Sequence, residues 1–280
     1  MLPIPTPFLE KCIKLFNHRI IFDFDDAIFL RPSWCKENSQ ETLHDHDMKR
    51  KISNIISLSS RVIAANEYLV NFAKKYNQEV TIIPTPIDSR KYVSVPRKKR
   101  IPEIIIGWVG TSGNLYYLNA LTSVFENLFK QFPRLRVKII CDFVTGEEYP
   151  FLKLPQVIFK EWSIYEELKN LRSIDIGIMP LAADSWTRGK AGFKIIQYMA
   201  LGIPVVASPI GYNRELIDDK INGFFANDSR EWIRKLTLLI EDRKLRKKIG
   251  NEGKNFIERN YSIEVIYPKL AKIFEEILRS

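Results

Sequence analysis

The chain has 280 residues, of which 45% are hydrophobic and 12% aromatic, so it can bury a substantial core and does not resemble a disordered protein. This length suits one large or two modest domains. The formal net charge of +10 permits polyanionic, anionic-lipid or phosphorylated partners. No zinc-finger spacing or recognised nucleic-acid motif accompanies the basic residues, so we expect a basic surface and no nucleic-acid binding.

Cysteine usage and hydropathy indicate the compartment. Cys12, Cys35 and Cys141 are far apart and form neither a metal spacing nor a disulfide framework, which fits a reducing environment. Lys11 and Lys14 interrupt the N-terminal apolar stretch, and no apolar run approaches the roughly 18 residues of a transmembrane helix. We therefore expect a cytoplasmic protein, whose positive charge would suit peripheral association with the anionic inner face of a membrane.

The first third of the chain predicts a small α/β domain over residues 1–86. Hydrophobic patterning predicts strands at 19–24, 61–65 and 80–83, helices at 47–58 and 67–75, and a polar loop at 31–45. A doubly wound domain usually has more strands before its equivalent of residue 19. The domain therefore looks incomplete, either naturally or through the choice of chain ends. Residues 87–102 are rich in proline and basic residues, which predicts an interdomain linker.

The second part predicts a Rossmann-like domain over residues 103–262. Apolar strands are expected at 104–109, 135–141, 157–160, 175–179, 205–207 and 223–226. Helices are expected at 114–132, 164–171, 192–201, 230–241, 243–259 and 263–278, with the segment 263–280 packing back on the N-terminal domain. This alternation predicts a parallel sheet covered on both faces. Ligands bind beyond the carboxyl ends of such strands, so the loops 110–113, 180–192 and 208–215 should converge on one cleft.

Residues 190–208 are the most informative stretch for function. Lys190, Lys194 and Gln197 are spaced by four and three residues, so on a helix they would share one side. The start of a helix attracts anions through its free N–H groups and its dipole. Two lysines there predict a phosphate site, and the amide could hold a hydroxyl. The alternative is a surface helix with solvated lysines.

Two further loops carry candidate donor-binding residues. Gly110, Thr111 and Ser112 follow one strand and precede a helix, so the backbone there could approach a phosphate or sugar closely. The spacing is not that of the dinucleotide fingerprint, and an ordinary tight turn is the alternative. Gly211 and Glu215 follow another strand, where the carboxylate could cap free N–H groups or accept hydrogen bonds from sugar hydroxyls.

Three carboxylates, Asp23, Asp25 and Asp26, stand at the end of the first predicted strand. They could bind a metal or act as nucleophile and acid, as in haloacid dehalogenase-type phosphatases, which this pattern resembles. Asp26 occupies the place where those enzymes usually have glycine, and a downstream acidic metal motif is not evident. We therefore favour acids that cap the next segment and line a cleft, and we expect no metal site.

Several segments together resemble the retaining nucleotide-sugar glycosyltransferases of the GT-B fold, group 1 type. The similar segments are 21–29 (IFDFDDAIF), 62–69 (VIAANEYL), 82–88 (IIPTPID), 106–110 (IGWVG), 175–180 (DIGIMP), 190–208 and 222–225 (NGFF). The resemblance implies two Rossmann-like domains, a nucleotide diphosphate-sugar donor held by the C-terminal one, and transfer with retention and without a metal or other cofactor. It also implies a glycan or lipid-linked acceptor on the N-terminal side, where Asp23, Asp25 and Asp26 would line the cleft.

The chain departs from this family at known site positions. The family glutamate that binds the donor ribose is matched by Gln197, and the one that contacts the donor sugar by Gly189. Lys190 and Lys194 are then expected to supply the charge that stabilises the leaving diphosphate, and so to be catalytic. Two hypotheses stay open: a glycosyltransferase, or a non-catalytic nucleotide-binding or assembly module derived from one.

Overall fold

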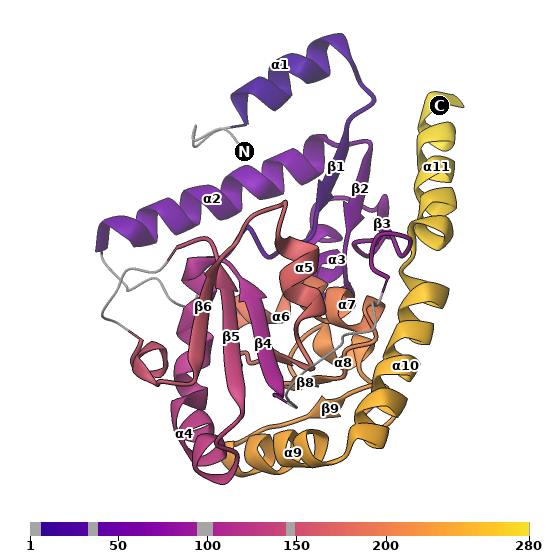
Figure 1. The fold of residues 1–280 in the computed structure, drawn as a ribbon. Helices are drawn as coiled ribbons and strands as arrows, with labels where there is room; N and C mark the ends of the chain where they lie inside the picture. Colours follow the sequence, from indigo (N-terminus) through magenta and orange to yellow (C-terminus); the bar gives the residue numbers. More distant parts are fainter. Residues whose placement is uncertain (1–6, 33–38, 94–102, 144–148, 280) are drawn as a thin grey trace. The chain divides into compact units, whose positions relative to one another are not determined.

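The computed structural model describes residues 7–32, 39–93, 103–143 and 149–279, and shows an α/β chain built on parallel sheets (Figure 1). The chain forms two compact units. The first comprises Met1–Pro86, Ala183–Ala191 and Ile263–Ser280, and the second comprises Ile87–Ala182 and Gly192–Ser262. The predicted fold class, α/β with parallel strands, is confirmed.

The first unit contains a three-stranded parallel sheet in the order β1-β2-β3. Its strands are β1 (Ile21–Phe24), β2 (Arg61–Ala64) and β3 (Val80–Ile82). Its helices are α1 (Phe8–Phe16), α2 (Ser39–Leu58), α3 (Glu67–Ala73), α6 (Ser185–Arg188) and α11 (Ile263–Arg279). The loop predicted at 31–45 is wrong from Ser39 on, where α2 already begins, and residues 33–38 lie outside the described residues.

Alternation along β2 divides the core of the first unit between the two faces of the sheet. Val62 and Ala64 pack into one cluster with α2 and α3, whereas Ile63 lies in a second cluster with α11. Successive side chains of a strand point to opposite faces, which explains the division. The second cluster joins Ile63 and Ile83 to Ile266, Ile273 and Ile277 of α11, which covers this face of the sheet.

The second unit contains a six-stranded parallel sheet in the order β6-β5-β4-β7-β8-β9. The strands are β4 (Ile105–Gly110), β5 (Arg136–Cys141), β6 (Val157–Glu161), β7 (Ile176–Met179), β8 (Val205–Ala207) and β9 (Phe224–Phe225). One core cluster contains Trp108 with residues of η1, α4 and α9, and the other contains Val109 with residues of α7. The sheet is therefore covered on both faces, as the apolar strands predict.

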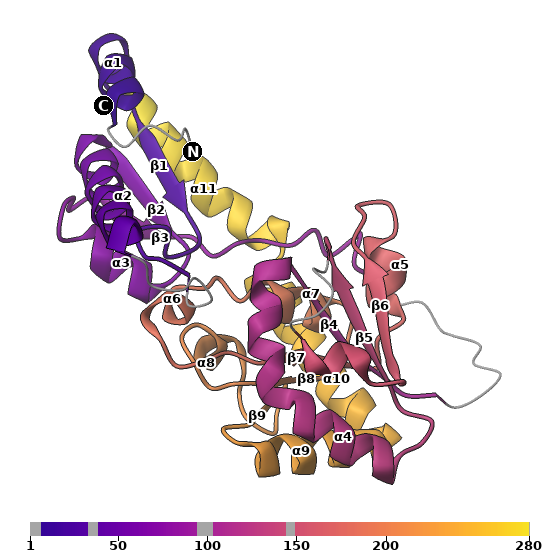
Figure 2. The same ribbon diagram turned by 90° about the vertical axis from the view of Figure 1, so that its left-hand side faces the viewer.

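The helices that cover the sheet of this unit also pack against one another. They are η1 (Ser112–Leu121), α4 (Thr122–Gln131), η2 (Pro150–Lys153), α5 (Glu167–Arg172), α7 (Phe193–Ala200), α8 (Asn213–Leu216), α9 (Ser229–Glu241) and α10 (Arg243–Asn260). Helix α9 packs on α4, and α10 packs on α7 (Figure 2). Gly250 permits the second contact, because a Cβ there would lie 2.0 Å from the carbonyl oxygen of Gly202.

The single helix predicted at 114–132 is wrong, because a 3₁₀ segment, η1, precedes α4. Leu115, Leu118 and Leu121 recur every third residue and are at most 1% exposed. A 3₁₀ helix has three residues per turn, so this spacing aligns all three leucines toward the core. The α-helical period begins only at Thr122.

The compact units divide the chain differently from the predicted boundaries. Residues 87–93 of the predicted linker belong to the second unit, where Ile87 bridges to Ser262, and residues 94–102 lie outside the described residues. The segment Ala183–Ala191, which was assigned to the donor-binding domain, belongs to the first unit. Lys190 is consequently separated from Lys194 by a boundary between the units.

Candidate functional site

The carboxyl ends of three neighbouring strands form one edge of the second unit. β4 lies beside β7, and β7 lies beside β8, all of them parallel. The segments that follow them therefore start at the same edge of the sheet, which is where open α/β sheets bind ligands. All the predicted donor residues except Lys190 belong to this unit: Gly110, Thr111, Ser112, Lys194, Gln197, Gly211 and Glu215.

Lys194 is held in the first turn of α7, close to the end of β4. Its Nζ lies 5.4 Å from the centre of the Trp108 ring, a cation–π distance. A Cβ at Gly110 would lie 2.8 Å from Lys194 Cε and 2.6 Å from the Trp108 ring. Gly110 thus makes room for the lysine stem beside the strand end. The N-cap residue of α7, Gly192, has φ 68° and provides no side-chain cap, so the helix start adds its own positive end.

Lys190 does not share a helix side with Lys194 and Gln197, so that prediction is wrong. Helix α7 begins at Phe193, and Lys190 stands in the loop after the short helix α6. The N-terminal boundary of α7 is set by Gly192, whose left-handed backbone interrupts the helical geometry.

Ser112 is engaged by the protein itself. Its N–H donates to Asp142 Oδ1 at 2.6 Å, and its hydroxyl lies 3.4 Å from Asp142 Oδ2. Asn114 in turn donates to Thr111 Oγ1 at 2.7 Å. The loop is therefore fixed at the end of β5 as well as β4, and in this structure the Ser112 amide is satisfied by a carboxylate rather than exposed to a ligand.

Gln197 takes part in a polar network that the sequence did not reveal. It is 4% exposed, and its Nε2 donates to Tyr92 Oη and to Glu167 Oε1, each at 3.0 Å. Trp162 Nε1 also reaches Glu167 Oε1, at 3.5 Å. Burial raises the pKa of Tyr92, and the negative charge of Glu167 raises it further. A carboxylate thus stands beside the amide at the same sheet edge.

Gly211 and Glu215 belong to the segment that forms the short helix α8 and the turn before it. The N-cap residue of α8 is Tyr212, without a side-chain cap hydrogen bond, and Glu215 is an exposed residue inside that short helix. Glu215 thus lies in the first turn of α8, where its negative charge complements the positive end of the helix. Gly211 has φ 53°, a left-handed conformation that glycine adopts without strain.

Lys190 lies in a charged cluster of the first unit. It is 7% exposed, and its Nζ lies 5.4 Å from the centre of the Trp186 ring. Burial lowers the pKa of Lys190, while the charges of Asp26, Asp184 and Asp25 oppose that shift. The predicted acceptor-side acids and Lys190 are thus brought together within this unit.

Partial desolvation is the largest influence on the other two predicted acids, Asp23 and Asp25. Burial raises the pKa of Asp25, and Asp26 raises it further, although Lys190 acts in the opposite direction. Burial also raises the pKa of Asp23, with Asp25 as the second cause. A carboxylate with a raised pKa is a better proton acceptor at neutral pH, so the cluster can both orient and deprotonate a hydroxyl.

Gly189 fits its position because it has no side chain. A Cβ there would lie 2.5 Å from Ala27 Cβ. The Asn66 amide, which also caps α3, donates to the carbonyl oxygens of Gly189 at 3.2 Å and Lys190 at 3.4 Å. Steric contact within the first unit therefore excludes a larger residue at position 189 in this arrangement.

Over residues 7–32, 39–93, 103–143 and 149–279, no group of three or more His, Cys, Asp or Glu side chains is placed to hold a metal ion. Within the same ranges, no helix combines the length and the apolar character needed to span a bilayer.

Residues 104–242 match the family described as glycosyl transferases group 1. This part of the chain is therefore similar to the group 1 glycosyl transferases. The chain is also 26% identical over 242 residues to an uncharacterised glycosyltransferase of Methanocaldococcus jannaschii. The aligned region covers 82% of this chain and 60% of that protein. The chain thus spans about 60% of the length of this relative.

Solved structures share the fold of this chain. HepE of Anabaena, in complex with UDP and glucose, has a TM-score of 0.70 at 16% identity, covering 92% of this chain and 71% of that one. Sucrose-phosphate synthase of Thermosynechococcus elongatus has a TM-score of 0.77 at 13% identity, covering 96% of this chain and 70% of that one. At these identities the similarity shows the GT-B-type fold alone.

Proposed function

We propose that this protein is a retaining glycosyltransferase that moves a sugar from a nucleotide diphosphate-sugar to a hydroxyl of a glycan or lipid-linked acceptor. The observation that carries the proposal is the position of Lys194. Within the part of the chain that is similar to the group 1 glycosyl transferases, this cation lies at the uncapped start of α7 and beside the Gly110 strand end. A cation and a helix start together favour a diphosphate.

The donor we propose is a UDP-sugar, supported by the structures of HepE with UDP and with UDP-glucose. Gln197 and Glu167 are proposed to bind the ribose hydroxyls. The amide alone would make only neutral hydrogen bonds, whereas the neighbouring carboxylate can accept a charge-assisted one. Glu167 therefore offers the acceptor strength that Gln197 lacks.

In the proposed reaction the acceptor hydroxyl attacks the sugar carbon from the face that the diphosphate leaves. The bond from that carbon to the diphosphate oxygen breaks, and its electron pair goes to the leaving group. Lys194 stabilises this developing charge, and Lys190 is proposed as a second catalytic cation. Asp23, Asp25 and Asp26 are proposed to bind the acceptor hydroxyl and take its proton. Because lysines supply the positive charge, we propose that no metal cofactor is needed.

The localisation we propose is cytoplasmic, with peripheral association at an anionic membrane surface. The formal charge of +10 supports it, since each basic residue near such a surface is attracted to the lipid headgroups. It would bring the enzyme close to a lipid-linked acceptor.

Calorimetry with UDP, GDP and their sugars tests the donor site. Lys194→Ala should weaken UDP binding by about tenfold to a hundredfold, since a hydrogen bond to a charged group contributes about 1.5–3 kcal/mol. Lys169→Ala, which changes a lysine whose side chain is 76% exposed on α5, should leave binding unchanged. Sugar transfer should also survive EDTA. A folded protein that binds none of these nucleotides would contradict the donor site.

The second candidate is a non-catalytic nucleotide-binding or assembly module. It is favoured by Gly189, where Ala27 leaves no room for an acidic side chain. This candidate predicts UDP binding with no turnover of any UDP-sugar. Transfer of sugar to water or to an acceptor by the purified chain, abolished by Lys194→Ala, excludes it.

A further inference from the structure

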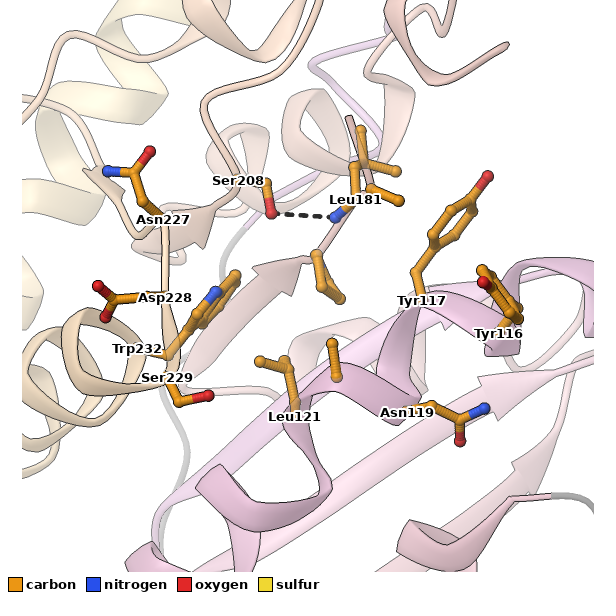
Figure 3. Close-up of a pocket in the computed structure, with 13 residues that line it drawn as sticks. Tyr116, Tyr117, Asn119, Leu121, Leu181, Ser208, Asn227, Asp228, Ser229 and Trp232 are labelled. Carbon is orange, nitrogen blue, oxygen red and sulfur yellow. Dashed lines mark hydrogen bonds between the residues drawn. The ribbon is translucent and has the colours of Figure 1, made fainter. Parts of the chain in front are cut away.

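A cavity of about 440 Å³ opens in the second unit, beyond the ends of β7 and β8 and between η1 and the start of α9 (Figure 3). Its volume falls within the roughly 300–1,000 Å³ that small-molecule sites usually have. Its position sets it apart from the donor residues of α7, because η1 and α9 contribute to one core cluster and α7 to the other.

Aromatic and aliphatic side chains form the walls of this cavity. Figure 3 shows Tyr116 and Tyr117 on one side, Trp232 on the other, and Leu121 and Leu181 between them. Tyr116 is 46% exposed, so its ring is accessible at the rim. Such walls suit a ligand with an apolar face, since aromatic rings provide large and rigid contact areas.

Two hydrogen-bond donors, the Trp232 indole N–H and the Ser208 hydroxyl, line the cavity. Trp232 is 4% exposed as a residue, and its indole N–H is a donor among the side chains that line the cavity. Ser208 is 7% exposed and accepts from the Leu181 N–H at 3.0 Å, while among the described residues its own hydrogen meets no acceptor. Both groups can donate a hydrogen bond, so they favour a ligand that brings oxygen acceptors.

The charge of the lining excludes phosphates. Lys, Arg and His are absent from the residues that line the cavity in the described part of the chain. The acidic residue, Asp228, has its carboxylate turned away from the cavity in Figure 3 and accepts from the Glu231 N–H at 2.8 Å. The site therefore suits a neutral ligand with both an apolar face and several oxygen atoms.

We propose that this cavity binds a neutral sugar residue of the acceptor glycan. The apolar face of a pyranose would pack against the aromatic walls, and its hydroxyl or ring oxygens would accept from Trp232 Nε1–H and Ser208 Oγ–H. The inference rests on the proposed glycosyltransferase function, and it adds an acceptor subsite on the donor-binding unit. It also implies that the acceptor is an oligosaccharide rather than a simple alcohol.

Ligand-observed NMR on the full chain tests this subsite. Methyl α- and β-glucosides, galactosides and N-acetylglucosaminides serve as probes at millimolar concentration. We expect saturation transfer to at least one of them, and a shift of the Trp232 indole N–H signal, identified by its loss in Trp232→Phe. Ala120→Trp places a ring into the cavity from an exposed wall residue and should weaken that binding at least tenfold.

The matched control is Ser123→Trp, an exposed position on α4 that does not line the cavity, which should bind the glycoside normally. UDP affinity should be unchanged in both variants. Binding of no glycoside, or equal binding by Ala120→Trp, overturns the subsite while UDP binding stays intact. Displacement of the glycoside by a UDP-sugar but not by UDP assigns the cavity to the donor sugar, and this also overturns the proposal. Loss of UDP binding by the unaltered chain would instead contradict the proposed function.

Discussion

Asp25 illustrates, at the scale of one residue, how a candidate site opposes stability. Asp25 is an exposed residue, yet partial desolvation, followed by the charge of Asp26, raises the pKa of its carboxyl. A group whose pKa is higher in the folded state stabilises the fold fully below its unfolded pKa. That contribution is lost as the pH rises through the folded pKa. At neutral pH the ionised carboxylate therefore lowers the free energy of unfolding, a cost that structures retain where function requires it.

Replacing Asp25 by Asn should stabilise the protein at pH 7. The amide keeps the shape of the side chain but removes the partly desolvated charge and its repulsion from Asp26, so the melting temperature should rise slightly. The rise should disappear near pH 3, where the wild-type carboxyl is protonated. Asp47→Asn, at an exposed position on α2, serves as the control in thermal unfolding at both pH values. A lower melting temperature at pH 7 would mean that attraction to Lys190 outweighs burial.

At the scale of elements, the Gln197 amide ties α7 to α5. Its two hydrogen bonds of 3.0 Å reach Glu167, in the first turn of α5, and Tyr92. An acid at position 197 would place a second carboxylate against Glu167. Like charges at that separation cannot both ionise without a large energetic cost. The amide at position 197 is thus explained by a partner that is 30 residues away in the sequence.

Gln197→Glu should accordingly lower the melting temperature at pH 7 and weaken UDP binding. The double variant Glu167→Gln with Gln197→Glu exchanges the two groups and should recover much of both losses. Thermal unfolding at pH 7 and calorimetry with UDP measure the effect. A single Gln197→Glu variant that binds UDP more tightly at an unchanged melting temperature would refute the role given to Glu167.

Elements differ in how far the sequence alone could predict them. The strand at Val205–Ala207 was predicted to the residue, because a short apolar run after a Gly-Ile-Pro turn depends on local patterning. The position of Lys190 was not, because the left-handed Gly192 and the packing of Gly189 against Ala27 depend on contacts between distant segments. The Tyr92–Gln197–Glu167 network was missed for the same reason. The rule that ligands bind at carboxyl strand ends could have drawn attention to Glu167, which follows β6.

At the scale of the whole molecule, the chain passes between the two compact units four times, after Pro86, Ala182, Ala191 and Ser262. The first unit is therefore assembled from three separate stretches of sequence. Its last stretch, α11, brings Ile266, Ile273 and Ile277 against the face of the sheet that carries Ile63. Burying one isoleucine side chain contributes about 1.5–3 kcal/mol to the free energy of unfolding. The burial of three is therefore comparable to the whole net stability of a typical domain, about 5–15 kcal/mol.

Deletion of residues 263–280 should unfold the first unit and spare the second. Hydrogen exchange followed by mass spectrometry should show lost protection in β1, β2 and β3, while β4, β7 and β8 stay protected. Leu278→Ala, which truncates a side chain on α11 that is 66% exposed, is the control and should leave the protection of both sheets unchanged. Equal loss of protection in both sheets would show that the two units do not fold independently.

The discontinuity of the first unit also has a consequence for how the protein is made. A ribosome adds about 5–20 residues per second, so the roughly 180 residues from Ile87 to Ser262 take on the order of 10 to 35 s to emerge. During that interval the face of the first sheet that carries Ile63 has no α11 to cover it. All strands of the second unit have been synthesised once Phe225 is added, so this unit can fold before α11 of the first unit is made. A nascent chain with an uncovered apolar surface tends to bind chaperones, and the order of synthesis lets the second unit complete its sheet first.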